Sequence, residues 1–176
     1  EWVGGQLTAH LVPPDYGLCV ETTGTTARYR RYRDGVRQYY RDHYPLTDKA
    51  RGTRLLNPGE CVITPLAHEP RVGVAVLGQM TAWAESSGRL TVLRGYRPVA
   101  VDVDGDRVQA VTFRHRQHGD TITVYADYVL DATDLGDLLP LARAEYVTGS
   151  ESRDETGEPH ALPGQSEPAR VQAYTW

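Results

Sequence analysis

The hydrophobic period of the chain changes near residue 88, and this change restricts the folds that the chain can form. Before residue 88, apolar residues in two segments recur every three or four positions, as they do in amphipathic helices. After it, apolar and polar residues alternate, as they do in strands with one exposed face. The pattern therefore predicts an α/β protein in which helices precede a run of antiparallel strands.

Residues 28–43 are predicted to form the first helix. Its aromatic and apolar stripe consists of Tyr29, Tyr32, Val36, Tyr39, Tyr40 and His43. Arginines occupy another face, where we expect them to stay solvated or to pair with acidic residues. Arginine mixed with tyrosine is also found on surfaces that bind nucleic acids. The formal net charge of -4 argues against that partner and against an acidic membrane.

A second helix is predicted from Glu69-Pro70 to about Ser86. Proline suits the first turn of a helix, and glutamate favours the positive end of the helix dipole. A glycine then follows, where a C-terminal cap is expected. Residues 11–24 and 45–65 are rich in turn-forming residues and are predicted to be loops.

Residues 90–126 are predicted to form an antiparallel β-meander. A short strand is expected at residues 90–93, and three alternating strands follow it. Asp104-Gly105 separates two of these strands, and Asp-Gly between alternating strands is a strong hairpin signal. A second turn is expected near Gly119, after which the chain enters the last strand of the meander.

Residues 128–132 form a continuous apolar run, which predicts a central strand buried on both faces of a different, largely parallel sheet. Residues 131–136 would then lie at the carboxyl end of that strand, where open α/β sheets bind their ligands. Asp134 is predicted to cap a following helix, with Asp137 in its first turn. Residues 148–170 are polar and are expected to be mobile.

The composition fits one soluble domain, because 40% of the 176 residues are hydrophobic and only 24% are charged. No membrane span or signal peptide is visible, so we expect a cytoplasmic protein with no membrane partner. Cys19 and Cys61 lack CxxC spacing, which predicts neither a metal site nor a disulfide framework. Lys49 is the only lysine among 19 basic residues, a bias typical of GC-rich bacterial genes.

Six segments, in order along the chain, resemble one family of proteins. They are WVGGQLT (2–8), RQYYR (37–41), LNPG (56–59), HEPRV (68–72), DATDLGDLLP (131–140) and ETGEPHA (155–161). Together they resemble FAD-dependent oxidoreductases of the glutathione-reductase-like superfamily, in its heterodisulfide-reductase-like branch. The resemblance implies that residues 1–176 are part of a Rossmann-like FAD-binding domain with an inserted antiparallel β-meander and helices.

Relatives carry a GxGxxG unit upstream of the segment that matches Trp2, and it ends in an acid that binds the adenosine ribose. The chain begins without methionine and ends on an apolar run, so we expect this N-terminal unit and a C-terminal part to be missing. Glu1 is a candidate for the remnant acid. The isolated chain is therefore expected to bind FAD weakly or not at all, because the helix N-terminus that neutralises the pyrophosphate would be absent.

The resemblance also implies a set of cofactor-binding residues. Without a Cβ, Gly4 and Gly5 would let backbone N–H groups approach the flavin's ribityl-pyrophosphate. Val99, or its neighbour Pro98, would meet the adenine through its backbone. Relatives have glycine at the position of Asp134, so Gly136 becomes the expected close-approach residue, and capping is the alternative role for Asp134 and Asp137. The full set is Gly4, Gly5, Gln6, Leu7, Thr8, Val99, Asp131, Ala132, Thr133, Gly136 and Asp137.

Flavin carries the redox chemistry itself, so the protein has only to position a substrate C–H bond near N5 and to supply a base or charge. His68 and Glu69, at a helix start, and Glu158 and His160, in the polar tail, are the candidate catalytic acids and bases. The alternative for each histidine is a surface or hydrogen-bonding role.

The leading hypothesis is therefore a fragment of an FAD-dependent oxidoreductase that transfers hydride from a small organic substrate to flavin, and the isolated chain is expected to be inactive. The alternative is a non-catalytic or split module that docks to a partner chain and completes the nucleotide-binding fold. The partner would be the rest of its own chain or a complementing subunit. A hydrolase built on Glu155 and Glu158 is disfavoured, because no nucleophile motif such as GxSxG is present.

Overall fold

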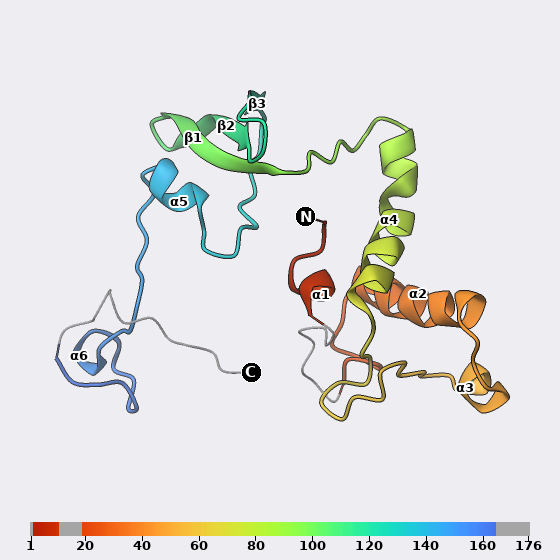
Figure 1. Ribbon diagram of the computed structural model, residues 1–176. Coiled ribbons are helices and arrows are strands. Elements are labelled where there is room, and N and C mark those ends of the chain that lie inside the picture. The colour runs from red at the N-terminus through yellow and green to blue at the C-terminus, as the bar shows by residue number, and fades with distance from the viewer. Residues whose placement is uncertain (1, 11–18, 165–176) are drawn as a thin grey trace. The chain divides into compact units, whose positions relative to one another are not determined.

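The computed structural model of the chain describes residues 2–10 and 19–164, and it divides into two units after Arg94 (Figure 1). The first unit carries the predicted helices, and the second carries the predicted meander. The fold class is confirmed as a mixed α/β protein with a three-stranded antiparallel sheet. That residues 1–176 belong to one FAD-binding domain stays a prediction.

The first unit contains four helices among its described residues. They are α1 (Gln6–Ala9), α2 (Ala27–His43), α3 (Asp48–Gly52) and α4 (Pro70–Ser86). The Thr26 side chain caps α2 by accepting a hydrogen bond from the Tyr29 N–H at 3.2 Å, and Pro70 occupies the first turn of α4. The two predicted long helices are thus confirmed. Helices α1 and α3 lie outside the predicted helices, because four or five residues are too few to show a period.

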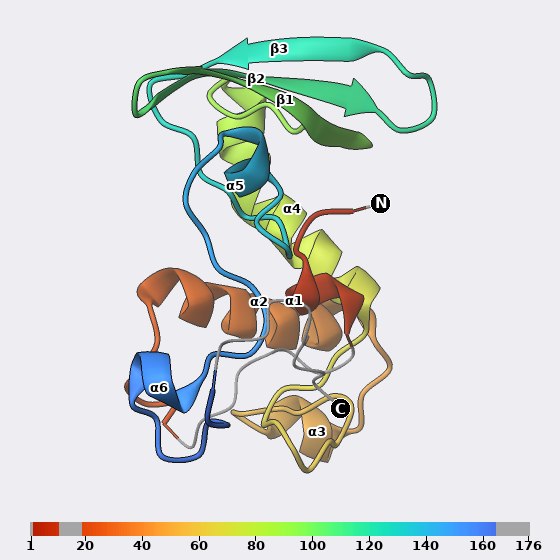
Figure 2. The same cartoon turned by 90° about the vertical axis from the view of Figure 1, so that its left-hand side faces the viewer.

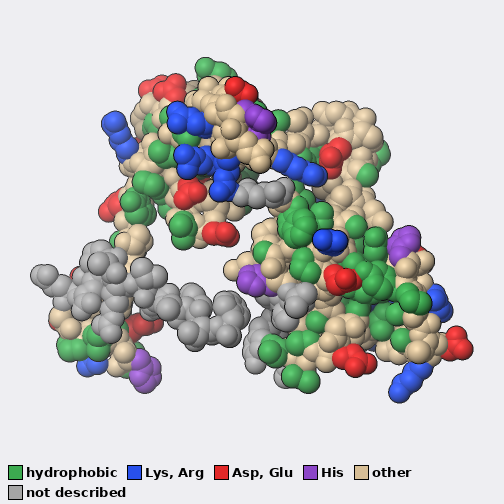
Figure 3. All heavy atoms as spheres, in the orientation of Figure 1, with side chains coloured by type: hydrophobic (Ala, Val, Ile, Leu, Met, Phe, Trp, Pro, Cys, Tyr) green, Lys and Arg blue, Asp and Glu red, His purple; other side chains and the backbone are tan. Residues whose placement is uncertain are grey.

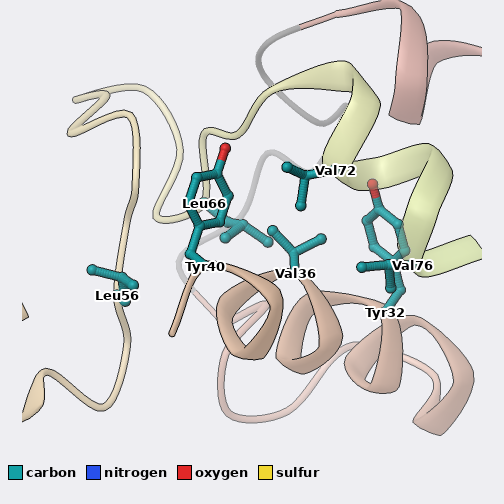
Figure 4. Packing of buried hydrophobic residues seen from close by; sticks show 7 residues of the cluster. All are labelled: Tyr32, Val36, Tyr40, Leu56, Leu66, Val72 and Val76. Carbon is teal, nitrogen blue, oxygen red and sulfur yellow. The ribbon is translucent and has the colours of Figure 1, made fainter. Parts of the chain in front are cut away.

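The core of the first unit lies where α4 runs across α2 (Figure 1). Val36 of α2 packs against Val72 and Val76 of α4, and other apolar side chains close the sides of this cluster (Figure 4). Gly35 allows the close approach, since a Cβ at this position would lie 2.8 Å from Cγ1 of Val76. The tyrosine stripe of α2 therefore faces inward, as its period predicts.

Two arginines of α2 depart from the expectation that arginines stay solvated. The side chains of Arg33 and Arg37 are 1% and 2% exposed, and both pair with the carboxylate of Glu21. Arg37 also donates from Nε to the Leu56 carbonyl at 3.0 Å. Pairing with an acid, the other expected outcome, is what occurs. The carboxylate comes from a segment outside the helix, so helical periodicity cannot reveal this pair.

The sheet of the second unit is the predicted meander. Strands β1 (Tyr96–Asp104), β2 (Arg107–His115) and β3 (Thr121–Tyr125) pair antiparallel in the order β1-β2-β3 (Figure 2). The predicted turns at Gly105 and Gly119 are confirmed, and both glycines have a positive φ.

The short strand predicted at residues 90–93 is wrong. This segment follows the end of α4 and is not in a strand. The described sheet begins at Tyr96, and β1 pairs only with β2. Four alternating residues form a strand only where a neighbour pairs with them, and no described strand does so here.

The predicted buried strand at residues 128–132 is also wrong. No strand forms there, and the side chains of Tyr128 and Leu130 are 87% and 86% exposed. An apolar run favours burial, but a parallel strand also needs neighbouring parallel strands. The only sheet in the described part of the chain is antiparallel. The argument that placed residues 131–136 at the end of a central strand therefore falls, and their role as a cofactor site rests on the resemblance alone.

Residues 131–138 form a loop that is closed by side chains. The Asp131 carboxylate accepts hydrogen bonds from the N–H groups of Thr133 at 2.9 Å and Leu138 at 3.0 Å. Helix α5 (Leu138–Leu141) follows, with Asp137 at its N-cap position and without a side-chain cap. The prediction that Asp134 caps this helix is wrong, because the helix begins three residues later than expected.

The polar tail contains a short helix, α6 (Arg153–Thr156), which the expectation of a mobile segment missed. The Ser152 side chain caps it by accepting a hydrogen bond from the Glu155 N–H at 3.3 Å. Residues 165–170 of this predicted tail lie outside the described residues, as do residues 11–18 of the first predicted loop. None of the described helices has the length and apolar character needed to cross a membrane.

Candidate functional site

The chain makes a tight turn at Gly4 and Gly5 just before α1. Gly4 has φ 119°, and Gly5 has φ 51° and ψ -128°, a conformation that side chains strongly disfavour. The carbonyls of Gly4 and Gly5 accept hydrogen bonds from the N–H groups of Leu7 and Thr8 at 3.0 and 3.1 Å. Among the residues that the structure describes, the N–H groups of Gly5 and Gln6 have no acceptor. The turn therefore presents two backbone donors.

Packing around Thr8 fixes this turn. Thr8 is buried, and its hydroxyl donates to the Val3 carbonyl at 2.7 Å. The Trp2 indole N–H donates to the Thr8 carbonyl at 3.0 Å. A Cβ on Gly4 would lie 2.4 Å from Cγ2 of Thr8 and 2.9 Å from Cδ1 of Leu77. Gly4 therefore has neither the conformation nor the room for a side chain.

A buried hydrogen-bonded pair joins α1 to the two long helices. The Tyr32 hydroxyl of α2 lies 3.0 Å from Nε2 of His68 and 3.3 Å from the Leu7 carbonyl of α1. Gly73 of α4 completes this contact, because a Cβ there would lie 2.6 Å from the Tyr32 oxygen and 3.2 Å from the Leu7 carbonyl oxygen. The position of α1 therefore depends on Tyr32, His68 and the absence of a side chain at Gly73.

The surroundings of His68 determine where its proton lies. Nδ1 of His68 is 2.9 Å from the Glu69 carbonyl, which can only accept, so Nδ1 carries the proton. In the neutral ring Nε2 is an acceptor, so the one proton of the Tyr32 hydroxyl is shared between Nε2 at 3.0 Å and the Leu7 carbonyl at 3.3 Å. Burial lowers the pKa of His68, and burial also raises the pKa of Tyr32. Both groups are therefore held in their neutral forms.

Glu69 faces different partners from its neighbour His68. Its carboxylate accepts hydrogen bonds from the hydroxyls of Tyr40, at 3.2 Å, and of Tyr44. The hydrogen bond to Glu69 raises the pKa of Tyr44 to about 12, and burial raises the pKa of Tyr40. The two tyrosines thus hold this carboxylate at the start of α4.

We expect stability to depend on pH through His68. Burial, assisted by the charge of Arg33, keeps the pKa of His68 below its ordinary 6.5 in the folded chain, so the unfolded chain binds the proton first as the pH falls. The stability from neutral His68 is fully present above about pH 6.5 and is lost as the pH falls through the lowered pKa.

Urea unfolding at about pH 7.5 and about pH 5.5 tests this expectation. His68→Gln should show a smaller difference in unfolding free energy between the two pH values than the unaltered protein shows. His160→Gln removes an exposed histidine and should keep the full difference. An equal difference in all three proteins would mean that His68 does not carry the effect.

The cofactor-binding residues predicted in the second unit lie in β1 and the loop before α5. Val99 of β1 falls at a register shift between Pro98 and Ala100, so it is the extra residue of a β-bulge. Gly136 has φ 67° in the loop before α5. The hydrogen bonds from Thr133 and Leu138 lower the pKa of the exposed Asp131.

The comparison with protein families decides between the classes of protein that these features allow. A family model described as FAD dependent oxidoreductase matches residues 1–176, which is the whole chain. The chain belongs to this family. Neither a curated protein nor a solved structure matches the chain significantly.

In this FAD dependent oxidoreductase family member, the predicted site residues fall into two groups. Residues 4–8 lie in the first unit, with His68 joined to them through Tyr32. Val99 and residues 131–137 lie in the second unit, as do Glu158 and His160, which are exposed. The structure thus brings the turn and His68 together, whereas Glu69 is held separately by its tyrosines.

Sequence reasoning missed two residues that shape this part of the flavoprotein family member. Tyr32 belongs to the apolar stripe of α2, so its hydroxyl was assigned to the core rather than to His68. Gly73 lies inside a helix, where glycine costs about 1 kcal/mol relative to alanine. A glycine in the interior of a predicted helix often marks a close contact, so the presence of Gly73 in this helix could have indicated the contact with α1 and α2.

Proposed function

We propose that this chain supplies part of the FAD site of an oxidoreductase, with the turn at Gly4 and Gly5 against the ribityl-pyrophosphate of the flavin. The single observation that carries the proposal is the pair of backbone N–H groups, of Gly5 and Gln6, that the glycine turn leaves without an acceptor in the described part of the chain. Backbone donors in such a turn are suited to phosphate oxygens. Family membership supplies the identity of the cofactor.

The residues around the turn fit this role. Apart from its chain neighbours, none of the described residues has an atom within 4 Å of a Cβ built on Gly5, so this part of the structure leaves room for a ligand beside the turn. Thr8 and Trp2 fix the turn from within the chain, and Tyr32 with His68 fixes α1 behind it. A donor pair held rigidly in this way binds an anion without the cost of first ordering the loop.

Flavin, when bound, supplies the hydride acceptor, and the chain's own residues bind, orient and move protons. We assign His68 a positioning role, because its ring is 2% exposed and both of its nitrogens face partners within the chain. Glu158 and His160 remain the candidates for acid or base chemistry, since both are exposed. The substrate class we propose is a small organic molecule that gives up hydride, and the proposed branch is the heterodisulfide-reductase-like one.

The cofactor that the full gene product carries tests this proposal. The protein is purified without added flavin, and the nucleotide released by heat is identified by chromatography. We expect FAD. Release of FMN or of another nucleotide would contradict the assignment, as would a protein that stays colourless after incubation with excess FAD.

A second candidate function is a module that docks to a partner chain, either the rest of its own chain or a complementing subunit. Exposed apolar side chains favour it, since Tyr128, Leu130 and Leu135 are 87%, 86% and 88% exposed. Exposed apolar side chains that gather into a patch mark an interaction site, and Figure 3 shows where apolar side chains, in green, reach the surface on one face. A module that depends on a complementing subunit would release no FAD when it is purified without that subunit and would gain FAD when the two are purified together, which separates this function from that of a flavoprotein that holds FAD alone.

A further inference from the structure

A groove of about 890 Å³ lies over α2 and α4 of the first unit, and none of its lining residues belongs to the proposed flavin site. We propose that this groove binds an organic polyanion, meaning a small molecule with an apolar body and two or more phosphate or carboxylate groups. The volume lies within the range of about 300–1,000 Å³ that is typical of small-molecule pockets.

The charge of the groove is strongly positive although the whole chain has a formal charge of -4. Five arginines and one aspartate are its charged lining residues: Arg30, Arg31, Arg37, Arg41, Arg54 and Asp34. Arg37 is neutralised by Glu21. The other four arginines form no ion pair among the described residues, so their charges are available to an anion.

Two of these four arginines are already oriented. Arg30 donates to the Thr22 carbonyl at 3.1 Å, and Arg41 donates to the carbonyls of Thr53 and Arg54 at 2.9 and 3.0 Å. A carbonyl does not neutralise the charge, and a guanidinium has five N–H donors, so donors remain for a ligand. These contacts hold the guanidinium groups in place before an anion arrives, which reduces the entropy lost on binding.

The spacing of these arginines selects the kind of anion. Arg30 and Arg41 are three turns apart on α2, which corresponds to about 16 Å along the helix axis. Anionic groups at separate positions match this spacing better than a single phosphate does. A ligand that uses the whole groove would therefore carry two or more of them.

Apolar residues also line the groove, which argues for an organic ligand rather than an inorganic one. They are Ala27, Gly35, Val76 and Met80. An apolar or aromatic body resting on these residues would remove apolar surface from water, at about 25 cal/mol per Å². A nucleic acid is disfavoured as the ligand, because its backbone requires positive charge over a longer track than one groove.

Calorimetric titration of the full gene product, loaded with FAD and then freed of unbound FAD, tests the proposal with three probes. ATP has a body and separate charges, pyrophosphate has charge alone, and adenosine has a body alone. We expect ATP to bind saturably and at least about tenfold more tightly than either of the others, because only ATP can contact both the arginines and the apolar lining residues. The affinity should fall as the salt concentration rises.

Variants locate the site. Arg31→Gln combined with Arg54→Gln removes two exposed arginines that have no described side-chain partner, and it should weaken ATP binding about tenfold or more. Arg71→Gln is the matched control, because Arg71 is exposed on α4 outside the groove. Gly5→Val should leave ATP affinity unchanged, which separates the groove from the flavin turn.

Three results would overturn the proposal. One is ATP binding no tighter than adenosine. Another is an equal loss of ATP affinity in Arg71→Gln and in the double variant. The third is tighter binding of a hexaglutamate peptide than of ATP. The natural occupant of the groove would then be an acidic protein segment.

Discussion

Replacing Glu21 with glutamine is expected to lower the free energy of unfolding of the first unit by about 3–5 kcal/mol. Glu21 is the carboxylate that pairs with both Arg33 and Arg37, and both guanidinium groups are buried. Burial lowers the pKa of Arg33 to about 10, so this side chain still carries its charge at neutral pH. Glutamine keeps the shape of the side chain but leaves two buried positive charges without their shared anion.

Urea unfolding followed by near-ultraviolet circular dichroism measures this loss, because the buried tyrosines of α2 report on packing around the pair. Glu85→Gln provides the matched control, since Glu85 is exposed on α4 and should change stability by less than about 0.5 kcal/mol. A Glu21→Gln protein that is as stable as the control would show that the ion pairs of Glu21 with Arg33 and Arg37 do not hold residues 19–25 to α2.

The elements that the sequence predicts well are those whose signals are local. The 3.6-residue period predicts α2 and α4 from residues that are close in sequence, and the glycines at positions 105 and 119 predict the two turns in the same way. The structure contains both helices and both turns. Residues 128–132 fail because apolar character alone does not specify a pairing partner. The Glu21 pair could not be predicted either, since nothing in a helical period indicates which distant acid will reach the helix.

The candidate site shows the same division between local and distant signals. Gly4 and Gly5 were identified from the resemblance, and both adopt the positive φ that a close-approach turn requires. The pairing of Tyr32 with His68 spans 36 residues, so neither residue's local context reveals it. His68 is buried, and its contacts within the chain support the positioning role that we propose for it.

Replacing Gly5 with valine is expected to remove flavin while the fold persists. At φ 51° and ψ -128° a branched side chain costs about 1–3 kcal/mol, so the turn must change its conformation and move the N–H groups of Gly5 and Gln6. Because no described residue other than the chain neighbours comes within 4 Å of the new Cβ, the described core is not overpacked. FAD affinity should therefore fall at least about tenfold, which corresponds to about 1.4 kcal/mol.

Variants at two other glycines serve as comparisons for the Gly5→Val result. Gly4→Ala should lose both flavin and stability, because its Cβ would also press on Thr8 and Leu77. Gly78→Val is the matched control, since Gly78 is an exposed helical position without a positive φ, and within the described ranges nothing beyond its own helix backbone comes within 4 Å of its Cβ. It should retain flavin.

The flavin-to-protein ratio of the full gene product, read from its visible absorption spectrum beside its far-ultraviolet circular dichroism, tests the central claim most directly. We predict a stoichiometric ratio in the unaltered protein and in Gly78→Val, and a flavin-free Gly5→Val protein with the same circular dichroism. A Gly5→Val protein that keeps stoichiometric FAD would contradict the account, because the turn before α1 would then not hold the cofactor.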